Sequence, residues 1–149
     1  MPVAPNTSRE DLGRFTMLVD DLPWTAARVS TDLAELPALD VYPVEEGFFI
    51  TARRPIDGGF EEFTLRSRVP AVNQDVSADS DTVRMTFRND ADGCRFLDFQ
   101  AGTLTITEYE PEGSKLTGTF WVTLQGESDC GVRTFTNGHF DIRLPETWP

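Results

Sequence analysis

The chain contains one histidine, His139, which is the first residue to consider for acid–base or nucleophilic chemistry. A Ser-His-Asp triad needs a serine nucleophile beside the imidazole, and one large class of hydrolases carries that serine in a G-x-S-x-G turn. The sequence has no such turn. His139 alternates with Phe140 and Ile142, so we expect it on the outward side of a strand with Asp141 and Arg143. The pattern predicts a surface histidine and no catalytic residue.

Acidic segments of the chain offer oxygen ligands of the kind that hard cations prefer. Residues 89–93 (NDADG) match the middle of an EF-hand loop, but aligning the glycines places Arg88 at the first ligand position and Phe99 where a glutamate belongs. Other acidic groups lie in expected turns, namely Asp20 and Asp21 in one, and Asp75, Asp79 and Asp81 in another. We expect solvated acidic turns and no metal site, with a cation held by gathered aspartates as the alternative.

The remaining signatures of enzymes are weak or absent from the sequence. Glycoside hydrolysis needs two carboxylates across a cleft, and a chain with 25 Asp and Glu residues always offers such pairs. Neither a phosphate-binding glycine loop nor a dinucleotide-binding fingerprint is present. We therefore expect a non-enzymatic protein without a cofactor, and keep a carbohydrate hydrolase that uses two carboxylates as an alternative.

Trp121 is the residue whose position best suggests binding. It alternates with Phe120 and Val122, which share a strand face with further apolar residues, so Trp121 shares the opposite face with Thr119 and Thr123. An indole gives a ligand a flat apolar contact, and neighbouring hydroxyls give hydrogen bonds. We predict that Trp121, Thr119 and Thr123 bind a carbohydrate or a protein partner. The alternative is that Trp121 is buried under a loop or in a central strand.

The charge of the chain limits its partners. It contains 25 acidic and 13 basic residues, a net charge of −12, and Lys115 is its only lysine. Nucleic acids and anionic membrane surfaces are poor partners, because both bind through basic patches. No apolar run approaches the roughly 18 residues of a membrane-spanning helix. An acidic surface with almost no lysine suits a salt-rich environment, because salt screens the repulsion between its charges. The alternative explanation for the scarcity of lysine is a genome rich in G and C, which favours arginine codons.

The chain places these residues on β-strands, because apolar and polar residues alternate along most of its length. Residues 32–39 are expected to form one helical turn limited by Pro37, and Asn137-Gly138 a tight hairpin turn. The pattern predicts strands around 15–19, 24–31, 47–54, 60–69, 83–87 and 94–99, a long polar loop at 70–81, and four strands within 102–144. We predict an all-β fold, an antiparallel β-sandwich or flattened β-barrel of about ten short strands.

The N-terminal residues 1–12 are polar and contain prolines, which predicts a flexible leader or tether. Residues 13–149 are expected to form a single all-β domain. The start of the chain carries no apolar segment of a signal peptide.

Several segments form a recognisable set: FTMLVDDLPWTA at 15–26, FFITARRPIDGGFEEFTL at 48–65, GTLTIT at 102–107, GTF at 118–120 and TNGHFDI at 136–142. Together they resemble a family of functionally uncharacterised all-β domains found in exported bacterial lipoproteins. The resemblance extends from Phe15 to Leu144 and implies export to the periplasm or the cell surface. The family's lipid-attachment cysteine has no counterpart here, so a lipid anchor is implied only for a longer precursor. No catalytic residues carry over.

Cys94 and Cys130 are the only cysteines of the chain. With one histidine they are too few for a tetrahedral zinc site unless carboxylates contribute. Cysteines pair in oxidising compartments and usually stay reduced in the cytosol. Because the resemblance implies an oxidising compartment, we predict a Cys94–Cys130 disulfide.

The resemblance and the lack of a catalytic signature together lead us to expect an exported, non-enzymatic binding or structural module of the cell envelope. The sequence does not specify its ligand or partner. A lipocalin-like carrier of a small ligand is the alternative if the strands enclose an apolar cavity. The carbohydrate hydrolase is the second alternative.

Overall fold

The computed structural model describes residues 12–44, 46–68, 72–77, 82–110 and 114–144. These residues form strands and turns, and no helix long and apolar enough to cross a membrane occurs among them. The strands are β1 (Gly13–Val19), β2 (Leu22–Thr25), β3 (Val29–Ser30), β4 (Glu35–Leu36), β5 (Leu39–Val44), β6 (Gly47–Ile56), β7 (Gly59–Arg68), β8 (Asp75–Ser77), β9 (Val83–Asn89), β10 (Arg95–Glu110), β11 (Lys115–Gly126) and β12 (Val132–Arg143).

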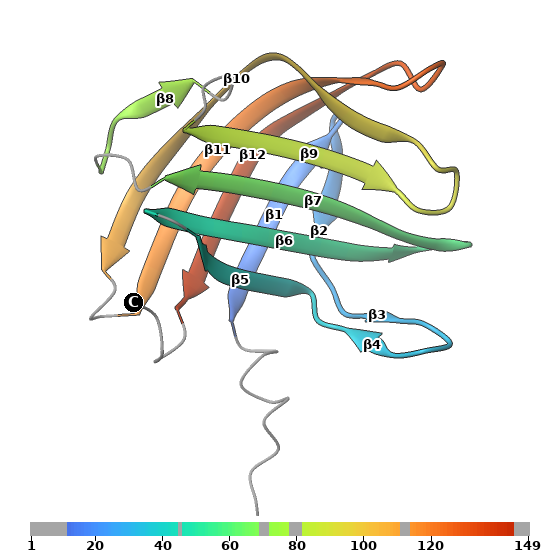
Figure 1. Ribbon diagram of the computed structural model, residues 1–149, viewed down its shortest axis with the longest axis horizontal. Coiled ribbons are helices and arrows are strands. Elements are labelled where there is room, and N and C mark those ends of the chain that lie inside the picture. Colours follow the sequence, from blue (N-terminus) through green and yellow to red (C-terminus); the bar gives the residue numbers. More distant parts are fainter. Residues whose placement is uncertain (1–11, 45, 69–71, 78–81, 111–113, 145–149) are drawn as a thin grey trace, which may run out of the picture.

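A ten-stranded antiparallel sheet forms the body of the protein, in the order β2-β1-β12-β11-β10-β9-β7-β6-β5, with β8 added beside β10. The sheet folds over into two layers. β5, β6, β7 and β9 cross one side, and β1, β11 and β12 run steeply behind them (Figure 1). β10 joins the layers, because Arg95 and Phe96 pair with β9 while its later residues pair with β11 and β8. The predicted sandwich or flattened barrel is confirmed.

The strand boundaries differ from the sequence prediction in both halves of the chain. In the first half, the strand expected at 24–31 is divided into β2 and β3, and β5 was not predicted. The two strands expected at 94–99 and 102–107 are one continuous strand, β10. Register shifts between Phe96 and Asp98 and between Phe99 and Ala101 let β10 bend without a break. The loop expected at 70–81 contains the short strand β8, and residues 70, 71 and 78–81 lie outside the described part.

The helical turn expected at 32–39 is also wrong, because β3 and β4 form a small hairpin there. The Thr31 hydroxyl accepts the backbone N–H of Ala34 at 3.0 Å and donates to the Ala34 carbonyl at 2.7 Å. The Thr31 N–H also donates to that carbonyl, at 2.8 Å. Threonine side chains that bond to nearby backbone in this way favour turns over helices.

Aromatic rings fill the space between the two layers. The ring of Phe63 on β7 lies 5.1 Å from that of Phe120, 5.5 Å from that of Phe135 and 5.6 Å from that of Phe15, measured between centroids. All four side chains are at most 4% exposed. Removing such rings from water stabilises a fold by about 1.5–3 kcal/mol for each side chain. The alternating apolar residues of the sequence therefore build one aromatic core.

Two glycines on neighbouring strands make room for two of these rings. Gly118 of β11 pairs with Phe140 of β12, and Phe120 of β11 pairs with Gly138 of β12. A Cβ atom on Gly138 would lie 2.5 Å from the Phe120 ring, and a Cβ atom on Gly118 would lie 2.6 Å from the Phe140 ring. Each phenylalanine therefore covers the glycine opposite it, which closes the core over both positions.

The expected hairpin turn at Asn137-Gly138 is wrong, because both residues lie inside β12. Phe120 pairs with Gly138 and Val122 pairs with Phe135, so Thr136 and Asn137 together oppose a single residue of β11. This is a β-bulge, and Asn137 adopts a left-handed conformation with φ 51°. Asparagine tolerates that conformation and glycine makes room for a ring, so the dipeptide serves a bulge as well as it serves a turn.

We expect Gly138→Ala to lower the free energy of unfolding by about 1–3 kcal/mol, the usual cost of overpacking a core. The added methyl group meets the ring of Phe120, which is 4% exposed and held by other rings. Urea denaturation measures the loss. The control is the double variant Gly138→Ala/Phe120→Leu, because the smaller leucine leaves room for the added methyl group. Its loss of stability should be smaller than the sum of the losses of the two single variants. Additive losses would contradict the clash.

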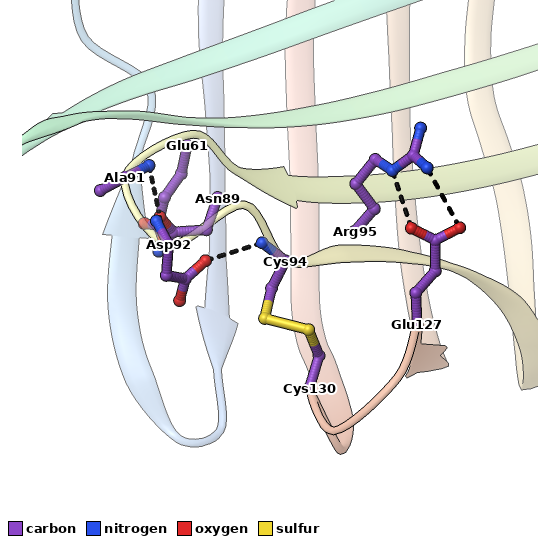
Figure 2. Close-up of a disulfide and its surroundings, with 8 residues drawn as sticks. All are labelled: Glu61, Asn89, Ala91, Asp92, Cys94, Arg95, Glu127 and Cys130. Atoms are coloured by element: carbon purple, nitrogen blue, oxygen red, sulfur yellow. Dashed lines mark hydrogen bonds and ion pairs between the residues drawn. A yellow bond between two sulfur atoms is a disulfide. The ribbon is translucent and has the colours of Figure 1, made fainter.

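The predicted Cys94–Cys130 disulfide is confirmed, with the two Cα atoms 5.8 Å apart (Figure 2). It joins the turn before β10 to the loop between β11 and β12. Beside it, Arg95 binds both carboxylate oxygens of Glu127 at 2.8 and 3.2 Å. The disulfide therefore holds the β9–β10 turn against the end of β11.

Candidate functional site

Trp121 lies on the outer face of the layer that β10, β11 and β12 form, and its side chain is 42% exposed. The predicted outward position is therefore observed. Thr119 is exposed beside it, and Thr123 is half-buried on the same strand face. The alternation of β11 produces this arrangement, since Phe120 and Val122 point into the aromatic core.

A shallow depression of about 480 Å³ surrounds the indole. β10, β11 and β12 each contribute to it, with Thr103, Thr105, Thr119, Phe120, Trp121, Thr136, Asn137, Gly138 and His139 as lining residues. Two of the three predicted binding residues, Trp121 and Thr119, line the depression, and Thr123 does not.

The bulge in β12 shapes the depression next to Trp121. Thr136 and Asn137 oppose Trp121 where a regular strand would place one residue. On the other side, Thr103 of β10 pairs directly with Trp121. The indole therefore lies between a threonine and a bulged strand whose asparagine has left the regular conformation.

A second row of polar side chains runs beside the indole, two residues further along the strands. Thr105 of β10 pairs with Thr119 of β11, which pairs with His139 of β12. The hydroxyl of Thr105 donates to Oδ1 of Asp75 on β8 at 2.5 Å, which fixes its orientation. His139 is exposed, as the alternation predicts, and it belongs to the depression.

The sequence reasoning missed most of the depression. It considered each strand alone, so it did not bring His139, Asn137 and Thr105 to the side of Trp121. The signal was present as the outward Thr pattern in TLTIT at 103–107 and in TFT at 134–136. The register of three strands was needed to combine the patterns into one surface.

The side chains that line the depression offer hydrogen-bond donors and acceptors, and Asp75 borders it through its bond to Thr105. Hydroxyls, one carboxamide and one imidazole surround the flat indole, and the lining residues include no carboxylate. Such a surface can hold a neutral polar ligand, because the ring gives apolar contact and the side chains exchange hydrogen bonds with hydroxyl groups.

Several of the groups considered as cation ligands have other partners where the structure describes them. Asp20 binds Arg133 at 2.9 Å and accepts the N–H of Thr134. Asn89 accepts the N–H groups of Ala91 and Asp92, so the NDADG segment forms a self-bonded turn. Within the described ranges no group of three or more His, Cys, Asp or Glu side chains could hold a metal ion. Asp79 and Asp81 fall outside those ranges.

Two carboxylates of the described residues are nearly buried, Asp40 and Glu61, and the partners of Glu61 stabilise one end of the sandwich. Glu61 is 8% exposed and accepts hydrogen bonds from Nε1 of Trp24 at 3.0 Å and from Nη2 of Arg54 at 2.7 Å. The Arg54 guanidinium also lies over the Trp24 ring at 5.6 Å. Asn89 is 3.4 Å from the second oxygen of Glu61. This network holds β2 onto β6 and β7.

Comparisons with protein-family models, with curated proteins and with solved structures give no match for this chain.

Proposed function

We propose that this protein is an exported, non-enzymatic module of the cell envelope that binds a neutral carbohydrate on the face carrying Trp121. The observation that carries the proposal is the depression of about 480 Å³ around an indole that is 42% exposed. Large exposed aromatic side chains are costly to leave in water and are enriched at binding surfaces. The surrounding hydroxyl, amide and imidazole groups match the hydroxyl-rich edge of a sugar.

Three features support the compartment part of the proposal. The Cys94–Cys130 disulfide is a kind of bond that persists in oxidising compartments and is rare in the cytosol. The set of segments from 15–26 to 136–142 resembles domains of exported lipoproteins. The net charge of −12 also suits a salt-rich compartment, because salt screens the repulsion that would otherwise destabilise the folded state.

The binding surface is proposed on the outside of the sheet because the described interior is filled. The rings of Phe63, Phe87, Phe120 and Phe135 pack at centroid distances of 4.9–5.5 Å where a lipocalin-like carrier keeps a ligand cavity. The nearly buried carboxylate Glu61 is held by Trp24 and Arg54, an arrangement suited to stability. Neither alternative function therefore draws on a specific observation in the described part.

We expect Trp121→Ala to weaken binding of a neutral oligosaccharide at least about tenfold, as loss of an aromatic hot spot does. The same substitution should lower the free energy of unfolding by about 1 kcal/mol or less, because the side chain is exposed. Isothermal titration against gluco-, xylo- and N-acetylglucosamine oligomers measures the first effect, and urea denaturation the second.

Leu97→Ala is the matched control, because Leu97 is 39% exposed on β10 and does not line the depression. It should bind like the wild-type protein. If Trp121→Ala binds every oligomer as the wild type does, or if no oligomer binds the wild type, the proposal fails. A stability loss of about 3–5 kcal/mol would make Trp121 a core residue instead.

A further inference from the structure

Two arginines lie directly opposite each other on the outer face of the other layer. Arg66 of β7 pairs with Arg84 of β9, and both side chains are exposed. Like charges opposite each other on neighbouring strands destabilise a sheet. The chain contains 25 acidic residues, yet neither of these two paired positions carries one.

Two acidic groups on the same face of the sheet, Asp40 and Glu62, are already paired with other arginines. Asp40 binds Arg53 at 2.8 Å, and Glu62 binds Arg53 at 3.0 Å and Arg88 at 3.2 Å. Within the described residues, by contrast, the guanidinium groups of Arg66 and Arg84 make no ion pair, hydrogen bond or ring contact.

Aromatic and hydroxyl side chains continue the same surface. Phe49 of β6 pairs with Arg66, and Tyr42 of β5, which is 50% exposed, pairs with Phe49. The row across the sheet is therefore Tyr42, Phe49, Arg66 and Arg84. The next row on this face holds Asp40, Thr51, Thr64 and Thr86. Asp40 and Thr51 are buried, while Thr64 and Thr86 are half-buried and their hydroxyls are in contact.

We propose that this row binds an acidic oligosaccharide, with one uronic-acid carboxylate held between Arg66 and Arg84. Guanidinium groups bind carboxylates through paired hydrogen bonds, while aromatic faces and threonine hydroxyls suit the sugar ring. The net charge of −12 does not prevent this, because charges beyond about 8 Å are largely screened at physiological ionic strength. Asp40 and Glu62 on the same sheet face are bound by Arg53 and Arg88.

This inference does not depend on the Trp121 depression, which lies on the other layer. Oligogalacturonate is the probe, a neutral galacto-oligosaccharide is the ligand control, and isothermal titration is the measurement. Arg66→Ala/Arg84→Ala should bind oligogalacturonate at least about tenfold more weakly than the wild type, because each lost guanidinium removes charge-assisted hydrogen bonds.

Arg14→Ala/Arg143→Ala is the matched control. It removes the same charge from exposed arginines of β1 and β12 that have no ion pair in the described part. It should bind like the wild type. Equal binding by the Arg66/Arg84 variant, no binding of oligogalacturonate by the wild type, or equally tight binding of the neutral oligomer would overturn the proposal. So would tighter binding of oligoglutamate, which would assign the row to an acidic peptide.

The ligand-free stability gives an independent readout. Because opposed like charges are unfavourable, Arg84→Thr should raise the melting temperature by about 1–3 °C without ligand. A fall in melting temperature would show that the pair stabilises the sheet, and the case for a missing anionic partner would be lost.

Discussion

Phe63→Ala should lower the free energy of unfolding by about 3–5 kcal/mol, the usual cost of removing a large buried ring. Phe63 is fully buried, and its ring contacts those of Phe15, Phe120 and Phe135, which come from three other strands. The remaining rings are held by their own strands, so they cannot close the cavity. Urea denaturation followed by tryptophan fluorescence measures the loss.

Two further variants make this test decisive. Phe63→Leu keeps most of the volume and should cost about 1.5 kcal/mol or less, so it gives a reading even if the alanine variant does not fold. Leu33→Ala removes a side chain that is 97% exposed and should change stability by less than about 0.5 kcal/mol. If Phe63→Ala were no worse than Leu33→Ala, the ring cluster would not be the core of this fold.

Cys94→Ser/Cys130→Ser should lose about 4 kcal/mol of stability by the chain-entropy estimate. The bond closes a loop with a sequence separation of 36 residues, and that loop includes all of β10 and β11. Without the bond the unfolded chain regains the freedom of this loop. The comparison of urea midpoints for the oxidised wild type and the variant measures the effect.

Reducing agent supplies the control for the serine substitutions. It should lower the melting temperature of the wild type and leave the double variant unchanged, because the variant has no bond to reduce. Titration of free thiols in the denatured, unreduced wild type should find none. Two reactive thiols, or a wild-type melting temperature that the reducing agent does not change, would contradict a disulfide in the folded protein.

The outward position of Trp121 could be predicted from the sequence because it depends only on neighbouring residues. Strand geometry turns each side chain to the face opposite the one before it, so Phe120 and Val122 in the core place Trp121 outside. The same rule placed His139 on the surface. Local periodicity therefore determines which side of a strand a residue occupies, but not which residues of other strands lie beside it.

The bulge at Asn137 shows where local patterns mislead. Asn-Gly suits a tight turn because both residues tolerate unusual backbone conformations, and the same tolerance suits a bulge. The bulge is favoured here because the ring of Phe120 on the neighbouring strand packs directly over Gly138. A residue that lies 18 positions away in the sequence, on another strand, therefore decides how this dipeptide is used.

By itself, the sequence determined the all-β class, the inward and outward faces of the main strands and the aromatic core, since all of these follow from the alternation of residues. The disulfide required the inferred compartment as well. Only the tertiary structure decided that β10 runs unbroken between the layers, that Thr105, Thr119 and His139 form one row beside Trp121, and that Arg66 faces Arg84. Pairing between distant strands depends on register and bulges, which arise from packing across the sheet and not from the local order of residues.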